Sequence, residues 1–295
     1  MAADADQPAV TGSPGFSRDV ADNKPYFCVV GSPIRHSKSP VIHQAFAAQF
    51  GIGLIYERVE VRAGGLAAAI AAFREARGSG MNVTVPLKEE AWRLAAEHAP
   101  RAALAGAANT LWFGRDGTLM ADNTDGVGLV RDLQSNHGID LRDRRILLLG
   151  AGGAARGVLP ALLEARPALV TVSNRTLPRA QQLAAMMPAE APVETLPWGK
   201  DPAEPPDIIV NATALSLNEE LPPLSSRVLA PYTVCYDMMY GTRATVFVAW
   251  ARSHGARLAL DGLGMLVEQA AEAFWIWHAR RPQTGAVIAQ LRSGV

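Results

Sequence analysis

Two serines stand close together in the segment GSPIRHSKSP, Gly31 to Pro40, which follows an apolar run typical of a buried strand. Ser37 and Ser39 come just before a helical pattern begins. Their hydroxyl groups can donate hydrogen bonds to a phosphate or to a carboxylate. They can instead serve the helix itself, because Ser39 before Pro40 has the residue types of an N-cap and a favourable first turn. The segment by itself leaves these three interpretations open.

The segment RILLLGAGGAARG suggests phosphate binding, since an apolar run leads into glycines and then into a helical pattern. Gly150 permits a tight turn, Gly152 lets the backbone approach a pyrophosphate, and Ala155 takes the place of the third glycine of a dinucleotide fingerprint. The N-terminus of the helix would direct free N–H groups at the phosphates. A plain glycine-rich turn is the alternative. The residues expected to face the cofactor are Gly150, Ala151, Gly152, Gly153 and Ala154.

The end of the next strand-like run indicates which dinucleotide would bind. An NAD site usually carries Asp or Glu there, to accept hydrogen bonds from the ribose 2′-hydroxyl. This chain has Asn174, Arg175 and Thr176 instead. A guanidinium group suits a 2′-phosphate through charge-assisted hydrogen bonds, although Arg175 could also be a solvated loop charge. The predicted cofactor is NADP(H).

A third polar segment is NVTVP, followed closely by a lysine. Asn82 and Thr84 alternate with Val83 and Val85, so the polar pair would share one face of a strand while the valines pack into the core. Lys88 stands beside two glutamates, and its local sequence favours a solvent-exposed lysine at the start of a helix.

Alternating strand and helix patterns must position these side chains, and they predict mostly parallel sheets covered on both faces. The expected strands are 26–31, 54–61, 81–86, a hairpin of 109–113 and 118–122, then 144–150, 168–174, 207–213 and 233–239. The expected helices are 39–51, 66–77, 88–98, 124–137, 154–166, 178–187, 244–254, 262–279 and a short one after 284. The proline-rich segment 187–207 predicts a surface loop or a weak edge element. The expected fold class is α/β with two lobes, an N-terminal α/β substrate domain and a Rossmann-type dinucleotide-binding domain, with a ligand cleft between them.

Composition excludes several classes of protein. The chain has 295 residues, 49% of them hydrophobic and 19% charged, which suffices for buried cores. Basic and acidic residues number 28 each, so neither a nucleic-acid nor a membrane partner is expected. Cys28 and Cys235 lie far apart, a pattern typical of a reduced, cytoplasmic protein without a metal site. Residues 1–24 are polar, lack the features of a signal peptide and are expected to form a disordered tail.

Six segments in order resemble shikimate dehydrogenase, a member of the shikimate/quinate dehydrogenase family, from about Tyr26 to the C-terminus. They are GSPIRHSKSP, NVTVPLKEE, GAANTL…DNTDG, GAGGAARG, NRT and DGLGMLVEQA. The resemblance implies NADPH-dependent reduction of 3-dehydroshikimate to shikimate, a step toward chorismate and the aromatic amino acids. It implies a substrate domain of residues 25–123 completed by 262–295, and an NADP domain of 124–261. The protein would be a monomer or a homodimer.

The resemblance also implies the roles of individual residues. Ser37 and Ser39 would bind the substrate carboxylate, and Lys88 with Asp125 would form the catalytic pair, with the identity of the proton donor left open. Lys88 and Asp125 are also implied to contact the substrate. Further substrate contacts are implied for Asn82, Thr84, Asn109, Tyr240 and Gln269. Further cofactor contacts are implied for Asn211, Thr213, Met238 and Gly262. Because Gln269 is among them, the C-terminal helix should pack back on the first lobe.

Two segments depart from the family pattern. After NAT, relatives carry a serine or proline and then a glycine, whereas this chain has Ala214 to Leu217, so the shape of this loop is not implied. Thr245 lacks the usual following proline but should still cap a helix. The alternatives are a quinate/shikimate paralogue that uses NAD or a related cyclohexene acid, and a nucleotide-sensing scaffold without turnover. The paired serines and Arg175 favour shikimate and NADP.

Overall fold

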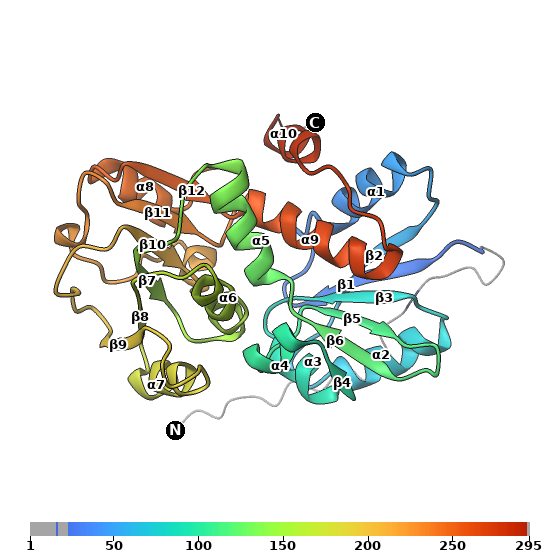
Figure 1. Cartoon of the computed structure of the whole chain (residues 1–295). Helices are drawn as coiled ribbons and strands as arrows, with labels where there is room; N and C mark the ends of the chain where they lie inside the picture. Colours follow the sequence, from blue (N-terminus) through green and yellow to red (C-terminus); the bar gives the residue numbers. More distant parts are fainter. Residues whose placement is uncertain (1–15, 17–22, 294–295) are drawn as a thin grey trace, which may run out of the picture.

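The computed structural model describes Phe16 and residues 23–293, which form two six-stranded sheets flanked by helices (Figure 1). Most of the expected tail, residues 1–24, lies outside the described residues. Within that tail Phe16, Asn23 and Lys24 are described, and the Phe16 ring lies 5.2 Å from that of Phe73 and 6.3 Å from that of Tyr26. Within the described part of the chain, no helix is long and apolar enough to cross a membrane.

The first sheet has the strand order β2-β1-β3-β5-β6-β4. Its first three strands pair in parallel, whereas β5 and β6 form the expected antiparallel hairpin, so the sheet is mixed. The strands are β1 (Tyr26–Gly31), β2 (Ile55–Glu60), β3 (Gly80–Val83), β4 (Glu97–His98), β5 (Thr110–Phe113) and β6 (Leu119–Asp122). The helices of this half are α1 (Ser39–Gln49), α2 (Leu66–Glu75), α3 (Lys88–Leu94) and α4 (Pro100–Ala105).

Two expectations for this half are wrong. Strand β3 ends at Val83, so Thr84 follows the strand and Val85 is 42% exposed rather than part of the core. The helix expected to reach residue 98 ends at Leu94 and is followed by β4 and α4, two elements too short for a periodic pattern. Pro100 begins α4, where its missing N–H does no harm.

The second sheet has the order β12-β11-β10-β7-β8-β9, and all its pairs are parallel. The chain winds outward in both directions from β7 and β10, which creates a switch point where α/β sheets bind ligands. The expected weak edge element is confirmed as β9. The strands are β7 (Arg145–Leu149), β8 (Leu169–Asn174), β9 (Val193–Pro197), β10 (Ile208–Asn211), β11 (Val234–Asp237) and β12 (Leu258–Asp261), of which β12 was not predicted. The helical segments are α6 (Gly153–Glu164), α7 (Leu177–Ala185), η2 (Leu215–Asn218), η3 (Ser226–Val228) and α8 (Val246–Ser253).

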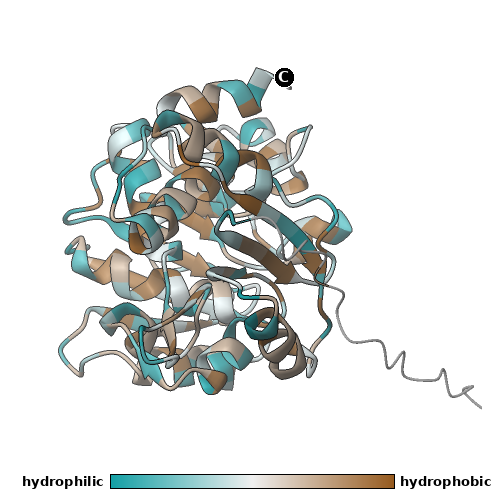
Figure 2. Cartoon of the chain, turned by 90° about the vertical axis from the view of Figure 1, so that its right-hand side faces the viewer, coloured by the Kyte–Doolittle hydropathy of each residue, from teal (hydrophilic) through white to brown (hydrophobic). Residues whose placement is uncertain are grey.

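Two helices connect the halves. The chain leaves the first sheet through α5 (Asp125–Arg131), continued by the π-helical turn η1 (Asp132–Asn136), and returns through α9 (Leu263–His278) and α10 (Gly285–Ser293). Figure 1 shows α5 and α9 lying between the two sheets. Each sheet has its own apolar core, and a further cluster joins α1 to α9 and α10. The C-terminal helix therefore packs on the first half, as expected. Figure 2 shows apolar residues gathered on the strands and hydrophilic ones along the outer loops.

Candidate active site

Lys88 and Asp125 form a buried ion pair. Lys88 is the first residue of α3 and Asp125 the first of α5, and the Lys88 Nζ contacts the Asp125 Oδ2. The two residues are only 8% and 4% exposed. The carbonyl of Lys88 accepts a hydrogen bond from the N–H of Ala108, which ties the start of α3 to the loop before β5. The proximity that the resemblance implied is confirmed, and the solvent-exposed lysine favoured by the local sequence is wrong.

The helix after the glycine-rich turn packs directly on this pair. A Cβ placed on Gly153 would lie 3.2 Å from the Lys88 Cβ, and one on Gly157 would lie 3.0 Å from the Asp125 Oδ2. Glycine at both positions therefore lets α6 approach more closely than a larger residue would allow. The dinucleotide fingerprint and the ion pair, which are distant in sequence, meet at this contact.

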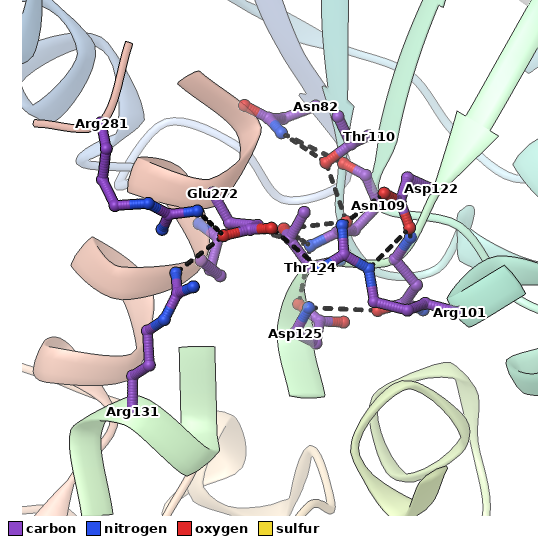
Figure 3. Close-up of polar contacts among 12 residues, drawn as sticks. Asn82, Arg101, Asn109, Thr110, Asp122, Thr124, Asp125, Arg131, Glu272 and Arg281 are labelled. Carbon is purple, nitrogen blue, oxygen red and sulfur yellow. Dashed lines mark hydrogen bonds and ion pairs between the residues drawn. The ribbon is translucent and has the colours of Figure 1, made fainter. Parts of the chain in front are cut away.

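Asn109 lies at the centre of a polar cluster that includes Asp125 (Figure 3). Its Nδ2 donates to the Asp125 Oδ1 at 2.9 Å and to the Gln269 Oε1 at 3.1 Å. Its Oδ1 accepts the backbone N–H of Thr124 at 2.9 Å. The cluster thus draws one side chain each from the residue before β5, the start of α5 and the middle of α9. These are three of the positions expected to contact the substrate.

The two serines lie at the start of α1. Ser39 is buried and Ser37 half-buried, and the Ser37 Oγ donates to the Ser39 Oγ at 3.1 Å. The Ser37 Oγ also accepts the N–H of Ser39 at 3.3 Å. The N-cap interpretation for Ser39 is wrong, because α1 begins at Ser39 itself and no described side chain caps it. Arg58 fixes the segment by donating from Nε to the Ser37 carbonyl at 2.6 Å.

Asn82 connects Tyr56 to the central cluster. The Tyr56 hydroxyl donates to the Asn82 Oδ1 at 2.6 Å, and the Asn82 Nδ2 donates to the Asn109 carbonyl at 3.2 Å. Burial raises the pKa of Tyr56, and a hydrogen bond with Ser39 acts in the opposite direction. A continuous polar chain therefore runs from Tyr56 through Asn82 to Asn109. Thr84, half-buried, follows the strand that holds Asn82.

The carboxyl ends of β7 and β10 have the features of a dinucleotide site. Gly150 has a φ of 110°, and a Cβ there would lie 3.1 Å from the Ala212 carbonyl oxygen, so glycine is required. A Cβ on Gly152 would meet nothing within 4 Å. No side chain of the described residues caps the N-terminus of the twelve-residue helix α6, which leaves its first N–H groups available. Ala151 is buried between these glycines, and Ala154 is half-buried in the first turn of α6.

The last residue of β8 and the two residues after it suit the 2′-phosphate that distinguishes NADP. Arg175 and Thr176 are exposed, whereas Asn174 is half-buried and donates from Nδ2 to the Thr176 carbonyl at 2.9 Å. That bond shapes the turn and leaves the Arg175 side chain at the surface. An exposed guanidinium group, the glycine backbone and helix N–H groups that no described side chain caps make a donor set that fits a phosphorylated dinucleotide.

The loop that departs from the family pattern is fixed by a buried carboxylate. The Asp237 Oδ2 accepts hydrogen bonds from Ser216 at 2.7 Å and Thr245 at 2.6 Å, and its Oδ1 accepts from the Asn211 Nδ2 at 3.1 Å. Burial raises the pKa of Asp237, against the effect of these donors. The Asn211 Oδ1 accepts from the Thr213 Oγ1 at 2.7 Å. Asn211 thus faces inward and positions Thr213, which is half-buried.

Met238, Tyr240 and Gly262 lie where the halves of the molecule meet. A Cβ on Gly262 would lie 2.3 Å from the Met238 carbonyl oxygen, so the start of α9 touches the end of β11. Met238 packs on the core of the second sheet, whereas Tyr240 packs on the cluster around α1 and α9. Burial raises the pKa of the Tyr240 phenol. Thr245 is confirmed as the N-cap of α8, accepting the N–H of Val248 at 3.2 Å.

Sequence reasoning missed several polar residues of this region. Tyr56 gave no signal, because it is one polar ring in a strand-like run. Thr124 lies within the recognised segment DNTDG but was not singled out, although its Oγ1 donates to the Gln269 Oε1 at 3.2 Å. An ionic group beside the cluster was also missed, since its members are far apart in sequence. That group is Arg101, Asp122, Arg131, Glu272 and Arg281.

Three family models match the chain in succession. The shikimate dehydrogenase substrate binding domain matches residues 29–111, and the shikimate/quinate 5-dehydrogenase model matches residues 132–218. The shikimate 5′-dehydrogenase C-terminal domain matches residues 262–292. These segments contain the serines, the ion-pair lysine, the glycine-rich turn and the part of α9 that carries Gln269.

Individual relatives agree with these matches. The shikimate dehydrogenase (NADP(+)) of Alkalilimnicola ehrlichii is 52% identical over 267 residues, which cover 90% of this chain and 98% of that protein. The crystal structure of an Ael1 enzyme from Pseudomonas putida is 44% identical with a TM-score of 0.83, covering 91% of this chain and 98% of that one. Shikimate 5-dehydrogenase from Thermus thermophilus, in complex with NADP(H) and shikimate, is 32% identical with a TM-score of 0.80, covering 92% and 100%. This chain belongs to the shikimate dehydrogenase family.

Proposed function

We propose that this protein is an NADP-dependent shikimate dehydrogenase, which interconverts 3-dehydroshikimate and shikimate on the route to chorismate and the aromatic amino acids. The observation that carries the proposal is the buried Lys88–Asp125 pair, held directly against the glycine-rich start of α6. A dinucleotide bound at that helix would lie beside an acid–base pair. The names of the relatives support both the substrate and the cofactor.

NADPH, when bound, supplies the hydride for reduction of the substrate ketone. The segment from Gly150 to Ala154 would hold its pyrophosphate through the α6 N–H groups. Asn174, Arg175 and Thr176 would bind the adenosine end, with the Arg175 guanidinium on the 2′-phosphate. The cofactor would also contact Thr213, placed by Asn211, and the backbone where Met238 meets Gly262.

Lys88 and Asp125 would act on the substrate oxygen. As the ketone is reduced, negative charge grows on its oxygen, and the Lys88 ammonium can stabilise that charge and donate a proton. Asp125 keeps the ammonium oriented and offsets the cost of burying it. Asn109 in turn holds the Asp125 Oδ1, so the carboxylate is fixed from both sides. In the oxidation of shikimate, the same pair would accept the hydroxyl proton.

The remaining polar side chains suit the rest of a small hydroxylated ring acid. Ser37 and Ser39 can donate to its carboxylate at the start of α1, a helix N-terminus that also favours an anion. Side-chain amides can bond hydroxyl groups as donor and acceptor at once, as proposed for Asn82, Asn109 and Gln269. Thr84 and Tyr240 complete the proposed set of substrate contacts.

Spectrophotometric turnover tests the proposal. Purified protein should reduce NADP⁺ in the presence of shikimate, seen as growth of the NADPH absorbance band, with kcat/KM far lower for NAD⁺ or quinate. Equal turnover of quinate with NAD⁺ would favour the quinate/shikimate paralogue instead. If the protein binds NADPH but turns over neither shikimate nor quinate with NADP⁺ or NAD⁺, the nucleotide-sensing scaffold without turnover would be favoured.

The domain boundaries and the cellular location are further proposals. Two separate sheets with separate cores support a substrate domain of residues 25–123 completed by 262–295, and a cofactor domain of residues 124–261. Two buried, unpaired cysteines, Cys28 and Cys235, support a cytoplasmic location. Limited proteolysis and cell fractionation would test these proposals, and sedimentation would decide between a monomer and a homodimer.

A further inference from the structure

Glu272 lies at the meeting point of three segments of the chain. Its side chain is 4% exposed, and among the described residues three guanidinium groups contact its carboxylate. Arg101 of α4 lies 2.9 Å from Oε1, while Arg131 at the end of α5 and Arg281 after α9 lie 2.7 Å and 3.0 Å from Oε2. Figure 3 shows the arginines converging on Glu272. Glu272 therefore ties both connecting helices to the first half of the molecule.

Arg101 extends this contact toward the active site. It donates from Nε and Nη2 to the two carboxylate oxygens of Asp122, at 3.1 Å and 2.5 Å, while its Nη1 holds Glu272. One planar guanidinium group thus bridges two buried carboxylates, a geometry that lysine cannot reproduce. Burial opposes ionisation of Glu272, but Arg101 and Arg131 outweigh it and lower the pKa of Glu272 to about 2. Glu272 is therefore charged at any working pH.

From Asp122 a short hydrogen-bonded path leads to Asp125. The Asp122 Oδ1 accepts the backbone N–H of Asn123 at 2.7 Å. The Asn123 Oδ1 accepts the N–H of Asp125 at 3.1 Å, and its Nδ2 donates to the Ala107 carbonyl at 2.9 Å. The carboxylate at the end of β6 thus fixes the turn from which Asp125 reaches Lys88.

A second route from Glu272 runs along α9. Gln269 precedes Glu272 by three residues, so both lie on one face of the helix. The Gln269 Oε1 accepts hydrogen bonds from Asn109 at 3.1 Å and Thr124 at 3.2 Å. Any rotation or slide of α9 that followed loss of the Glu272 contacts would move Gln269 away from Asn109.

We propose that Glu272 is a positioning residue of the dehydrogenase reaction, which sets Asp125 through Arg101 and Asp122 and sets Gln269 through α9. The inference rests on the proposed function. Glu272 need not touch substrate or cofactor for this role. Its effect on rate follows because a displacement of about 1 Å in a reacting group can lower turnover by on the order of a hundredfold.

A purely structural role is the competing explanation. Buried ion networks are weak evidence of stability, and removing one partner leaves uncompensated charge. If Glu272 served stability alone, its loss would lower the unfolding temperature and leave the kinetics of the folded enzyme unchanged. Kinetic constants measured well below the unfolding transition therefore separate the two roles.

The test compares Glu272→Gln with Arg281→Gln in the full-length protein, using shikimate and NADP⁺. Glu272→Gln should lower kcat by about tenfold to a hundredfold and raise KM for shikimate, with KM for NADP⁺ changed less than about twofold. Arg281 is the matched control, because it contacts the same carboxylate at Oε2, the oxygen that Arg101 does not contact, and its side chain is 45% exposed. Its variant should keep the wild-type constants.

A double-mutant cycle tests the route through Arg101. If Glu272 acts through Arg101, the losses of kcat/KM in Glu272→Gln and Arg101→Gln should not add, and combining Arg281→Gln with Glu272→Gln should lower kcat/KM no further than Glu272→Gln alone. Should Glu272→Gln not fold, Arg101→Lys keeps the charge, breaks the bridge and should show the same loss of kcat. If the wild-type protein is active and the Glu272 and Arg101 variants have the same kcat and KM as the wild type, the inference is overturned. An inactive wild-type protein would instead overturn the proposed function and, with it, this inference.

Discussion

The ammonium of Lys88 can be removed while the rest of its side chain is kept. The stem of Lys88 packs beside Gly153 of α6, and only its end contacts Asp125. Lys88→Met keeps the apolar stem and deletes the charge and the proton. It therefore separates the chemical contribution of the residue from its packing, which Lys88→Ala does not.

The expected loss follows from what the ammonium does. A positioned acid–base group contributes about 10² to 10⁴ in rate, or about 3 to 5 kcal/mol of barrier. Stability should fall too, since removing one partner of a buried ion pair costs about 3 to 5 kcal/mol. In the Lys88→Met variant Asp125 keeps the hydrogen bond from the Asn109 Nδ2 at 2.9 Å. We therefore expect the loss of stability to lie at the lower end of its range, about 3 kcal/mol.

The assay is steady-state turnover of shikimate at saturating NADP⁺, together with urea unfolding of the same samples. Lys88→Met should show the full loss of kcat with little change in KM. Lys88→Ala should match that kcat and lose about 2 kcal/mol more stability, because it also leaves a cavity against α6. A kcat within about threefold of wild type in Lys88→Met would refute the role assigned to the ammonium.

Three further predictions concern other parts of the site. Arg175→Ala should raise KM for NADPH by about tenfold or more while leaving KM for NADH nearly unchanged, and equal effects on both would exclude a contact with the 2′-phosphate. Ser37→Ala should raise KM for shikimate by about tenfold with kcat retained, whereas a fall in kcat alone would contradict a carboxylate anchor. Glu272, whose pKa falls from 4.5 to about 2 on folding, should contribute about 3 kcal/mol of stability above pH 4.5 that is lost as the pH falls toward 2. Acid titration of wild type against Glu272→Gln measures that difference, and parallel curves would show that the carboxylate is not held by its arginines.

Local patterns predicted the strands and helices well where they are long. The apolar run 146–149 and the fingerprint after it placed β7 and α6 correctly, and Thr245 was correctly expected as a cap. Short elements such as β4 and β12 carry too few residues for a period to emerge. The end of β3 was misjudged because alternation in NVTVP continues past Val83, whereas the backbone turns there.

The site was predicted only as far as motif resemblance extended. Nothing near Lys88 in the sequence indicates that it is buried. The helices that cover it, α5 and α6, are more than thirty residues further along the chain. Tyr56 and Glu272 belong to no recognised motif, and their partners come from other elements of the fold. The resemblance did not imply the shape of the loop from Ala214 to Leu217, and the structure shows that the Ser216 hydroxyl supports it by donating to Asp237.

The return of α9 to the first half has a consequence for synthesis on the ribosome. Ile42 and Phe46 of α1 are fully buried, and the residues that cover them include Val267 and Phe274 of α9. While the chain is being made, this apolar surface of α1 stays uncovered until those C-terminal residues leave the exit tunnel. The nucleotide-binding half can fold in the meantime. The nascent chain therefore passes through a stage in which one lobe is folded and the other still exposes apolar surface, to which chaperones bind.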